Sequence, residues 1–356
     1  MGMKVLVLGG TGAIGKELVN LLSASGIETF VTSRKKRQDE GLVRYIQGNA
    51  HHVEFLREIL SGNQWDVVVD FMVYTTASFK ERRDLFLRAT DQYVFISSAR
   101  VYADSDSPIT EKTCRLLDVS EDQLFLSTDE YSLAKARQED VLRNSGLHNW
   151  TIIRPYITYN ENRLQLGVFE KEEWLYRALH GRTIVFSRAI YTKKTTMTCG
   201  LDVARGILAI IGNPQSFGET FTITTKESHT WDYILSIYLD VLEEHLGYRP
   251  KVLLQSLDQF LACKSAKYQV IYDRLFNRQF DNSKIAPFFD TGSAVKTDTG
   301  LRACLEVFLD NPIFKTINWK TEAIKDRQSN ELAPLKEIPG IKQKIKYLIY
   351  RYLVNQ

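Results

Sequence analysis

The sequence has little that would mark a secreted, metal-binding or membrane-spanning protein. Its four cysteines are scattered over 356 residues without a Cys-x-x-Cys pair, so we expect unpaired thiols. The adjacent His51 and His52 would point apart on a helix, and we predict no metal site. No apolar run approaches the roughly 18 residues that cross a bilayer. The start, MGMKVLVLGGTG, lacks the ordered regions of a signal peptide, which predicts a cytoplasmic location.

An excess of charge of one sign is also missing. The 46 basic and 43 acidic residues give a net charge of +3, which is too small to indicate nucleic acid as a partner. The composition, 44% hydrophobic and 25% charged, is that of an ordinary globular protein. The length suits one large domain or two interleaved ones.

Short apolar strands alternate with helical patterns in the first half of the chain. We expect strands at residues 3–8, 28–32, 43–47, 65–71, 92–98 and 150–155, and helices at residues 16–24, 53–60, 79–89 and 129–140. Apolar strands that alternate with helices predict an α/β fold, a doubly wound parallel sheet covered on both faces.

The second half is less regular. Amphipathic helices are expected at residues 171–180, 203–212, 231–245 and 341–353, with strand-like pieces at 183–187 and 218–225. We therefore divide the chain into a nucleotide-binding domain, residues 1–165, to which residues 200–225 return, and a smaller lobe. That lobe, residues 166–356, is expected to be interleaved with the first domain, to bind substrate and to carry the C-terminal helix.

A glycine turn, GGTGAIG, follows the first strand and opens the first helix. Its spacing is Gly9-x-x-Gly12-x-x-Gly15. Glycine permits a tight turn and lets a pyrophosphate approach the backbone, while the helix start offers N–H groups and a positive dipole end. The position between strand and helix predicts a dinucleotide site. Cofactor contacts are expected from Gly9, Thr11, Gly12, Ala13, Ile14 and Gly15.

The end of the second strand bears on the choice of dinucleotide. An acid there would bind the adenosine ribose of NAD, but Ser33 and Arg34 occupy this position. A hydroxyl and a guanidinium suit a 2′-phosphate, which favours NADP over NAD. The alternative is a solvated basic loop, which would leave NAD as the cofactor.

A second cluster of motifs follows the fifth strand. Ser97-Ser98-Ala99-Arg100-Val101-Tyr102 lies where open α/β sheets bind their ligands, and Tyr131 and Lys135 follow about thirty residues later. Four residues apart, the phenol and the ammonium share one helix face. A neighbouring cation stabilises a phenolate and makes tyrosine a usable base near neutral pH.

Glycine turn, Ser-Ser-x-x-Val-Tyr and Tyr-x-x-x-Lys, in this order, resemble the extended short-chain dehydrogenase/reductases, the NAD-dependent epimerase/dehydratase family. The resemblance covers nearly all of the chain and includes Arg154-Pro155 and Asp202-Val203-Ala204. It implies a Rossmann fold and a catalytic set of Ser98, Tyr131 and Lys135. It also implies a nucleotide-sugar substrate in polysaccharide biosynthesis, with hydride transfer at a sugar carbon, C4, by an epimerase or a 4-ketoreductase. A homodimer is common in this family.

The resemblance extends to further contacts. It implies cofactor contacts from Asn49, Phe71 and Pro155, in addition to Tyr131 and Lys135. Candidate substrate contacts are Arg100, Tyr156, Arg163 and Arg182. The arginines are considered for nucleotide phosphates, and a structural or surface role is the alternative for Arg100.

Some residues depart from the family pattern. Ala99 and Arg100 replace the acid pair with which family dehydratases eliminate water, so a dehydratase is only an alternative. VVDFMVY and FDNSKI resemble an atypical branch that includes chloroplast stem-loop RNA-binding proteins. A non-catalytic RNA-binding or scaffold relative is the alternative from another class. The retained Tyr131 and Lys135 argue against it, and no nucleic acid is expected as a partner.

The C-terminal segment, IKQKIKYLIYRYL, places Ile341, Ile345, Leu348 and Tyr352 on one helix face and most of its basic residues elsewhere. Such a helix can lie on an anionic membrane surface. The favoured interpretation is a terminal helix packed on its own domain or on a second subunit, with membrane contact as the alternative.

Overall fold

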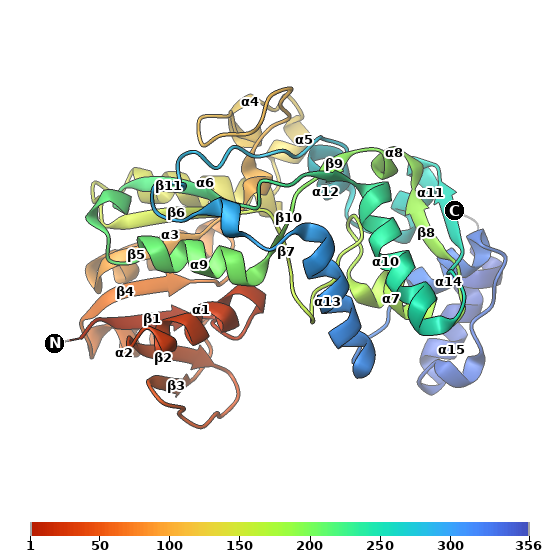
Figure 1. Ribbon diagram of the computed structural model, residues 1–356, viewed down its shortest axis with the longest axis horizontal. Coiled ribbons are helices and arrows are strands. Elements are labelled where there is room, and N and C mark those ends of the chain that lie inside the picture. Colours follow the sequence, from red (N-terminus) through yellow and green to blue (C-terminus); the bar gives the residue numbers. More distant parts are fainter. Residues whose placement is uncertain (1, 355–356) are drawn as a thin grey trace. The chain divides into compact units, whose positions relative to one another are not determined.

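The computed structural model describes residues 2–354 and contains a seven-stranded parallel sheet with helices on both faces (Figure 1). The strand order is β11-β6-β5-β4-β1-β2-β3. The strands are β1 (Lys4–Leu8), β2 (Glu28–Ser33), β3 (Val43–Gln47), β4 (Trp65–Asp70), β5 (Thr90–Ile96), β6 (Trp150–Pro155) and β11 (Glu219–Ile223). The predicted α/β, doubly wound Rossmann fold is confirmed.

The two faces of the sheet follow from the alternation of side chains along each strand. In β1, Val5 and Val7 join a core with helices α1 (Ala13–Ala24) and α9 (Gly200–Ile210). Leu6 and Leu8 join the opposite core, which includes residues of helices α2 (Val53–Ser61), α3 (Thr76–Arg88) and α6 (Tyr131–Arg143). Because both faces are covered, the middle parts of the central strands are apolar, as in Val5–Leu8 and Val67–Val69.

The strand order reverses direction between β1 and β4, since the chain adds β2 and β3 on one side of β1 and the later strands on the other. At such a point the connections leave in opposite directions and open a crevice at the carboxyl ends of the strands. The glycine turn follows β1 and Phe71 follows β4, so both lie at this edge of the sheet.

The chain divides into two compact units. The sheet unit contains the residues up to Thr158 together with Thr196–Glu227 and Gln279–Thr297. The second unit contains Tyr159–Thr195, Ser228–Arg278 and the residues from Asp298 onward. The chain therefore leaves the sheet unit and returns to it twice.

Shorter elements complete the sheet unit: η1 (Ala99–Val101), α4 (Leu116–Val119), α5 (Gln123–Leu126), β7 (Ile157–Tyr159), β10 (Met197–Cys199), η2 (Pro214–Ser216) and η4 (Thr291–Ser293). The helices of the second unit are α7 (Lys171–Leu179), α8 (Arg188–Tyr191), α10 (Trp231–Leu246), α11 (Leu257–Cys263), α12 (Lys267–Gln269), η3 (Val270–Arg274), α13 (Thr297–Asp310), α14 (Trp319–Gln328), η5 (Leu335–Glu337), α15 (Gly340–Leu348) and η6 (Ile349–Leu353). Its strands pair as β8 (Ile184–Ser187) with β13 (Val252–Gln255) and β9 (Lys194–Thr195) with β12 (His229–Thr230).

Several boundaries differ from the sequence prediction. Helix α1 begins at Ala13, three residues before the predicted start, because the glycine turn leads directly into it. The expected helix over residues 341–353 is α15 followed by the π-helical turn η6. Helices α13 and α14 were not predicted. Within residues 2–354, no helix is both long enough and apolar enough to cross a bilayer.

Candidate active site

The turn after β1 brings the backbone close to the start of helix α1. Gly9 has a φ of 72°, in the left-handed region that favours glycine. A Cβ on Gly15 would lie 2.7 Å from the Cα of Gly10, so a side chain there would force the helix away from the turn. Gly12 precedes α1 without a side-chain cap. The N–H groups of the first helical turn can therefore bind a pyrophosphate, as predicted for this segment.

The same segment holds the other predicted contacts, Thr11, Ala13 and Ile14. Thr11 is exposed, whereas Ile14 is partly buried against the core. Gly10 was not predicted as a site residue. A Cβ there would meet Val7 and Val31 within 2.9 Å, so this glycine lets the turn lie flat on the sheet. Only its place beside Gly9 could have drawn attention to it.

The predicted adenosine end lies where β2 ends and α2 begins. The Ser33 hydroxyl donates to the carbonyl oxygen of Lys35 at 2.8 Å and accepts its N–H at 3.3 Å. The Asn49 side-chain oxygen accepts the N–H of His51 at 3.1 Å. Burial lowers the pKa of His51, and the positive charges of Arg82 and Arg34 lower it further. The end of β2 and the start of α2 thus form a positively charged neighbourhood around Arg34.

Tyr131 and Lys135 occupy the first turns of helix α6. Helix α6 begins at Tyr131, after Glu130, whose carboxylate accepts the N–H of Ser132 at 2.7 Å. Lys135 is 2% exposed, and its Nζ donates to the carbonyl oxygen of Ile96 at 2.7 Å. The Nζ lies 6.0 Å from the centre of the Tyr131 ring. The sheet therefore holds the ammonium beside the phenol, in the arrangement that the sequence spacing predicted.

Ser98 lies in the segment that follows β5, between Ile96 and Arg100. It precedes η1, and its hydroxyl accepts the N–H of Arg100 at 3.2 Å. The Arg100 guanidinium donates to Glu130 at 2.5 Å and lies 5.2 Å from the centre of the Tyr131 ring. The segment from Ile96 to Arg100 thus contacts both Lys135 and Tyr131. Arg100 therefore contacts residues at the start of helix α6. Its predicted role in binding a substrate stays a prediction.

A buried carboxyl group that the sequence did not reveal lies beneath Lys135. Asp70 ends β4, is fully buried, and accepts the Tyr93 hydroxyl at 2.7 Å and the N–H of Met72 at 2.8 Å. Burial raises the pKa of Asp70 to about 6, although hydrogen bonds and Lys135 act in the opposite direction. Burial lowers the pKa of Lys135 to about 8, while Asp70 and Glu139 oppose this change. In the sequence, Asp70 could be noticed as the acidic residue that ends the apolar strand WDVVVD.

The remaining predicted contacts in the sheet unit are mostly buried. Phe71 is partly buried, and its Cβ lies 3.5 Å from the position of a Cβ on Gly9. Pro155 ends β6 in register with Ile223 of β11. Tyr156 is 6% exposed and its ring centre lies 5.1 Å from that of Phe280.

Two predicted substrate contacts lie in the second unit. Arg163 is 43% exposed at its side chain, with its Nε 3.9 Å from Glu170. Arg182 is 5% exposed and pairs with Glu322 at 3.6 Å and Asp326 at 3.4 Å. The predicted phosphate contact for Arg182 does not fit this geometry, since buried carboxylates already neutralise its charge.

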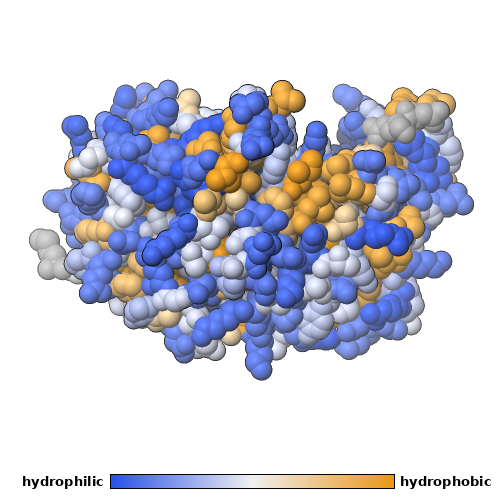
Figure 2. Space-filling model, turned by 90° about the horizontal axis from the view of Figure 1, so that it is seen from above, coloured by the Kyte–Doolittle hydropathy of each residue, from blue (hydrophilic) through white to orange (hydrophobic). Residues whose placement is uncertain are grey.

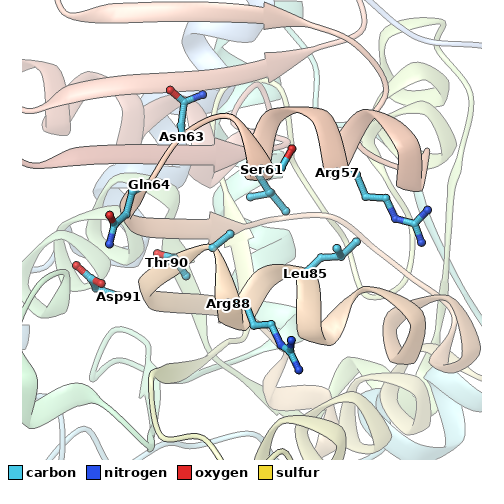
Figure 3. Close-up of a pocket in the computed structure, with 10 residues that line it drawn as sticks. Arg57, Ser61, Asn63, Gln64, Leu85, Arg88, Thr90 and Asp91 are labelled. Atoms are coloured by element: carbon cyan, nitrogen blue, oxygen red, sulfur yellow. The ribbon is translucent and has the colours of Figure 1, made fainter.

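Two pockets of the sheet unit differ in chemistry. One lies at the start of helix α6 and is lined by Val73, Tyr74, Thr75, Asp129, Tyr131, Ala134 and Lys135. Another lies between α2 and α3 at the amino ends of β4 and β5, where Figure 3 shows Arg57 and Ser61 on α2 and Leu85 and Arg88 on α3. In a parallel sheet this is the edge opposite the glycine turn. Tyr131 and Lys135 therefore share the first pocket, whereas Ser98 is not among its lining residues.

Part of the chain resembles a known family of domains. Residues 9–182 match the family model described as NAD(P)H-binding. This segment is thus similar to NAD(P)H-binding domains. The matched residues include the glycine turn, Ser98, Tyr131 and Lys135.

Solved structures of similar fold include epimerases. Epimerase Mth375 from Methanothermobacter thermautotrophicus is 16% identical, with a TM-score of 0.68 over 87% of this chain and 93% of that one. UDP-glucuronic acid 4-epimerase from Bacillus cereus, solved with UDP-glucuronic acid and NAD, is 18% identical, with a TM-score of 0.64 over 86% and 99%. At these identities the likeness shows the fold.

A curated relative has a different description. It is NADH dehydrogenase [ubiquinone] 1 alpha subcomplex subunit 9, mitochondrial, from Dictyostelium discoideum. The two are 24% identical in an alignment of length 259, and the match covers 67% of this chain and 64% of that protein. The chain thus matches less than two thirds of that relative's length.

Proposed function

We propose that this NAD(P)H-binding protein is an oxidoreductase or epimerase that acts on a nucleotide-sugar, with hydride transfer at a sugar carbon, C4. The observation that carries the proposal is the placement of Tyr131 and Lys135 on one face of helix α6. Both line one pocket, beside the segment that contains Ser98. A phenol, an ammonium and a hydroxyl so placed suit proton transfer to and from a sugar oxygen.

The residues of the glycine turn fit a dinucleotide. Gly9 to Gly15 provide a close backbone approach and an uncapped helix start for the pyrophosphate. Lys135 and Pro155 lie at the carboxyl ends of the strands, where the nicotinamide half would be held. When bound, the cofactor supplies or accepts the hydride.

In the proposed reaction, side chains of this protein transfer the proton. Tyr131 takes the proton from the sugar hydroxyl during oxidation and returns it during reduction. Lys135, as the ammonium, stabilises the phenolate of Tyr131, which is the form present before the oxidation and again after the reduction. Ser98 donates a hydrogen bond to the same sugar oxygen and so orients it. Held by the Ile96 carbonyl, the Lys135 ammonium stays in place while Tyr131 changes charge.

NADP is the cofactor we favour. Arg34 lies near His51 and Arg82, so the end of β2 offers positive charge to a 2′-phosphate. NADP in turn favours a 4-ketoreductase, which consumes its cofactor, over an epimerase, which retains it.

The first test is to denature freshly purified protein and to identify any released dinucleotide by mass. Retained NAD would support an epimerase, to be assayed with UDP-sugars. An empty protein that binds NADPH more tightly than NADH would support a reductase, to be assayed with 4-keto sugars. Failure to bind either dinucleotide would overturn the proposal.

The similarity to a respiratory-complex subunit favours a second candidate, a cofactor-binding subunit without turnover. It predicts tight dinucleotide binding with no hydride transfer to any sugar tested. It also predicts that Tyr131→Phe leaves every measurable property of the protein unchanged. A change in product formation in that variant would remove this candidate.

A further inference from the structure

The C-terminal helix carries a row of exposed isoleucines. Ile341, Ile345 and Ile349 are four residues apart, and they are 77%, 53% and 39% exposed. Residues four apart lie above one another on a helix, so the three form one stripe. Tyr352 and Leu353, in η6, continue the exposed apolar surface at 58% and 76%.

This stripe is not the face by which the helix packs on its own unit. Tyr347 is fully buried, and its hydroxyl donates to Asp326 of helix α14. Leu348 and Tyr350 are partly buried against the same small core, which includes Trp319 and Ala323 of α14. The helix thus has two apolar faces, and α14 covers only one of them.

Basic residues surround the exposed stripe. Lys342 and Lys346 are exposed, Lys344 is half-buried, and Arg351 follows in η6. The sequence from Ile341 to the C-terminus contains no acidic residue. The face drawn in Figure 2 is mostly hydrophilic, with hydrophobic residues gathered in a few patches.

We propose that α15 and η6 bind an anionic lipid surface, with Ile341, Ile345 and Ile349 inserted among the acyl chains. Their flanking lysines would then contact the lipid phosphates. A basic amphipathic helix with an apolar stripe is suited to lie in the plane of a membrane interface. The charge argues against a second copy as the occupant, because a symmetric contact would bring Lys342 and Lys346 of two chains together.

Co-sedimentation of the full chain with vesicles tests this proposal. Vesicles of phosphatidylcholine alone are compared with vesicles that contain phosphatidylglycerol, at low and high salt. We expect pelleting with the anionic vesicles only, reduced severalfold by salt. The triple change Ile341→Ser, Ile345→Ser, Ile349→Ser should reduce pelleting about tenfold, and Lys342→Gln with Lys346→Gln should also reduce it. Leu124→Ser with Ile313→Ser, which alters exposed residues elsewhere, should leave it unchanged.

A second measurement does not depend on the triple variant. All five native tryptophans are at most 5% exposed, so an indole introduced by Ile345→Trp can be followed separately. Brominated anionic lipids should quench it, and they should not quench the indole of the control Ile313→Trp. Equal behaviour of the two variants overturns the proposal. Equal pelleting with neutral and anionic vesicles would also overturn it. Concentration-dependent dimerisation that is lost in the triple isoleucine variant would overturn it as well.

Discussion

At the residue scale, the site depends on a cation that the fold buries. Lys135 is 2% exposed and is held by the Ile96 carbonyl, with Asp70 beneath it. A buried ammonium favours a phenolate next to it more strongly than an exposed one would, because the local dielectric is lower. Helix spacing could predict that Tyr131 and Lys135 share a face. The sequence shows an acidic residue at the end of this strand, but it does not show that Asp70 is paired with Tyr93, 23 residues away on the next strand.

Tyr131→Phe should abolish turnover while the protein still binds its cofactor. The change removes the proton-transferring hydroxyl and keeps the ring, so we expect kcat to fall by about 10³ or more. The dissociation constant for NADPH should stay within about tenfold. Tyr248→Phe, at a 47% exposed tyrosine, is the matched control and should be fully active. Full activity of Tyr131→Phe would contradict the assignment of the acid–base residue.

The buried Asp70 and Lys135 predict how the stability of the protein without bound cofactor depends on pH. The folded-state pKa of Asp70 is raised to about 6, so its contribution to stability is lost as pH rises from about 4 through 6. The folded-state pKa of Lys135 is lowered to about 8, so stability returns as pH rises from about 8 toward its unfolded value. From these two groups, the free energy of unfolding is lowest between pH 6 and 8.

Chemical denaturation at several pH values measures this effect, which is on the order of 1–3 kcal/mol for each group. Asp70→Asn should flatten the acid limb, and Lys135→Met should flatten the alkaline limb. The two groups interact, so the limbs belong to the pair. An unchanged acid limb in Asp70→Asn would show that Asp70 is already ionised near pH 4.

At the element scale, Gly12 and Gly15 of the turn have different structural roles. A Cβ on Gly15 would meet the backbone of Gly10 at 2.7 Å, whereas a Cβ on Gly12 would meet only the carbonyl oxygen of Gly9, at 3.8 Å. Gly15 therefore sets the distance between helix and turn, and Gly12 leaves space for a ligand. The spacing of the glycines could be seen in the sequence. The space available for a Cβ at each position could be seen only in the structure.

Gly12→Ala and Gly15→Ala should consequently fail in different ways. We expect Gly12→Ala to keep its melting temperature within about 2 °C and to lose dinucleotide affinity by about tenfold or more. Gly15→Ala should lower the melting temperature by several degrees, because α1 must move away from the sheet. Thermal unfolding with and without NADPH separates the two effects. Equal melting temperatures for both variants would contradict the packing role of Gly15.

Helix α6 is anchored by a buried carboxylate. Glu139 is fully buried and accepts hydrogen bonds from Arg154 at 2.5 and 2.8 Å and from Ser97 at 2.6 Å. Burial alone would raise the pKa of Glu139, but the Arg154 guanidinium holds it below the usual value. The network connects α6 to β5 and β6 and so fixes the position of Tyr131.

Glu139→Gln should therefore destabilise the fold by about 3 kcal/mol, because it leaves the guanidinium of Arg154 buried without its counter-charge. Denaturant unfolding measures the change. Asp84→Asn removes an exposed partner of Arg83, 2.8 Å away, and is the control, with an expected change below about 0.5 kcal/mol. Similar effects from the two variants would argue against a structural role for the buried network.

At the scale of the whole molecule, sequence patterns predicted the sheet far better than the second unit. The sheet strands are apolar and alternate with helices, so local patterns were sufficient. Helix α14 was missed because its buried residues include Glu322, Lys325 and Asp326, which look like a solvated face. They are buried with Arg177 and Arg182, more than 130 residues earlier in the chain. The same distant carboxylates pair with Arg182, and the sequence alone contains no sign of this pairing.

The order in which the sheet is assembled has a consequence for production of the protein in pieces. Strand β11 pairs with β6 at the edge of the sheet, and the chain reaches β11 only after passing through Tyr159–Thr195 of the second unit. A fragment that ends at residue 182 would lack both β11 and α9. It would leave β6 with an unpaired edge and the core around Ile153 uncovered. During synthesis, the seven-stranded sheet can be completed only after β11, which ends at Ile223, has been made. We therefore expect the fragment that ends at residue 182 to aggregate under conditions in which the full chain does not.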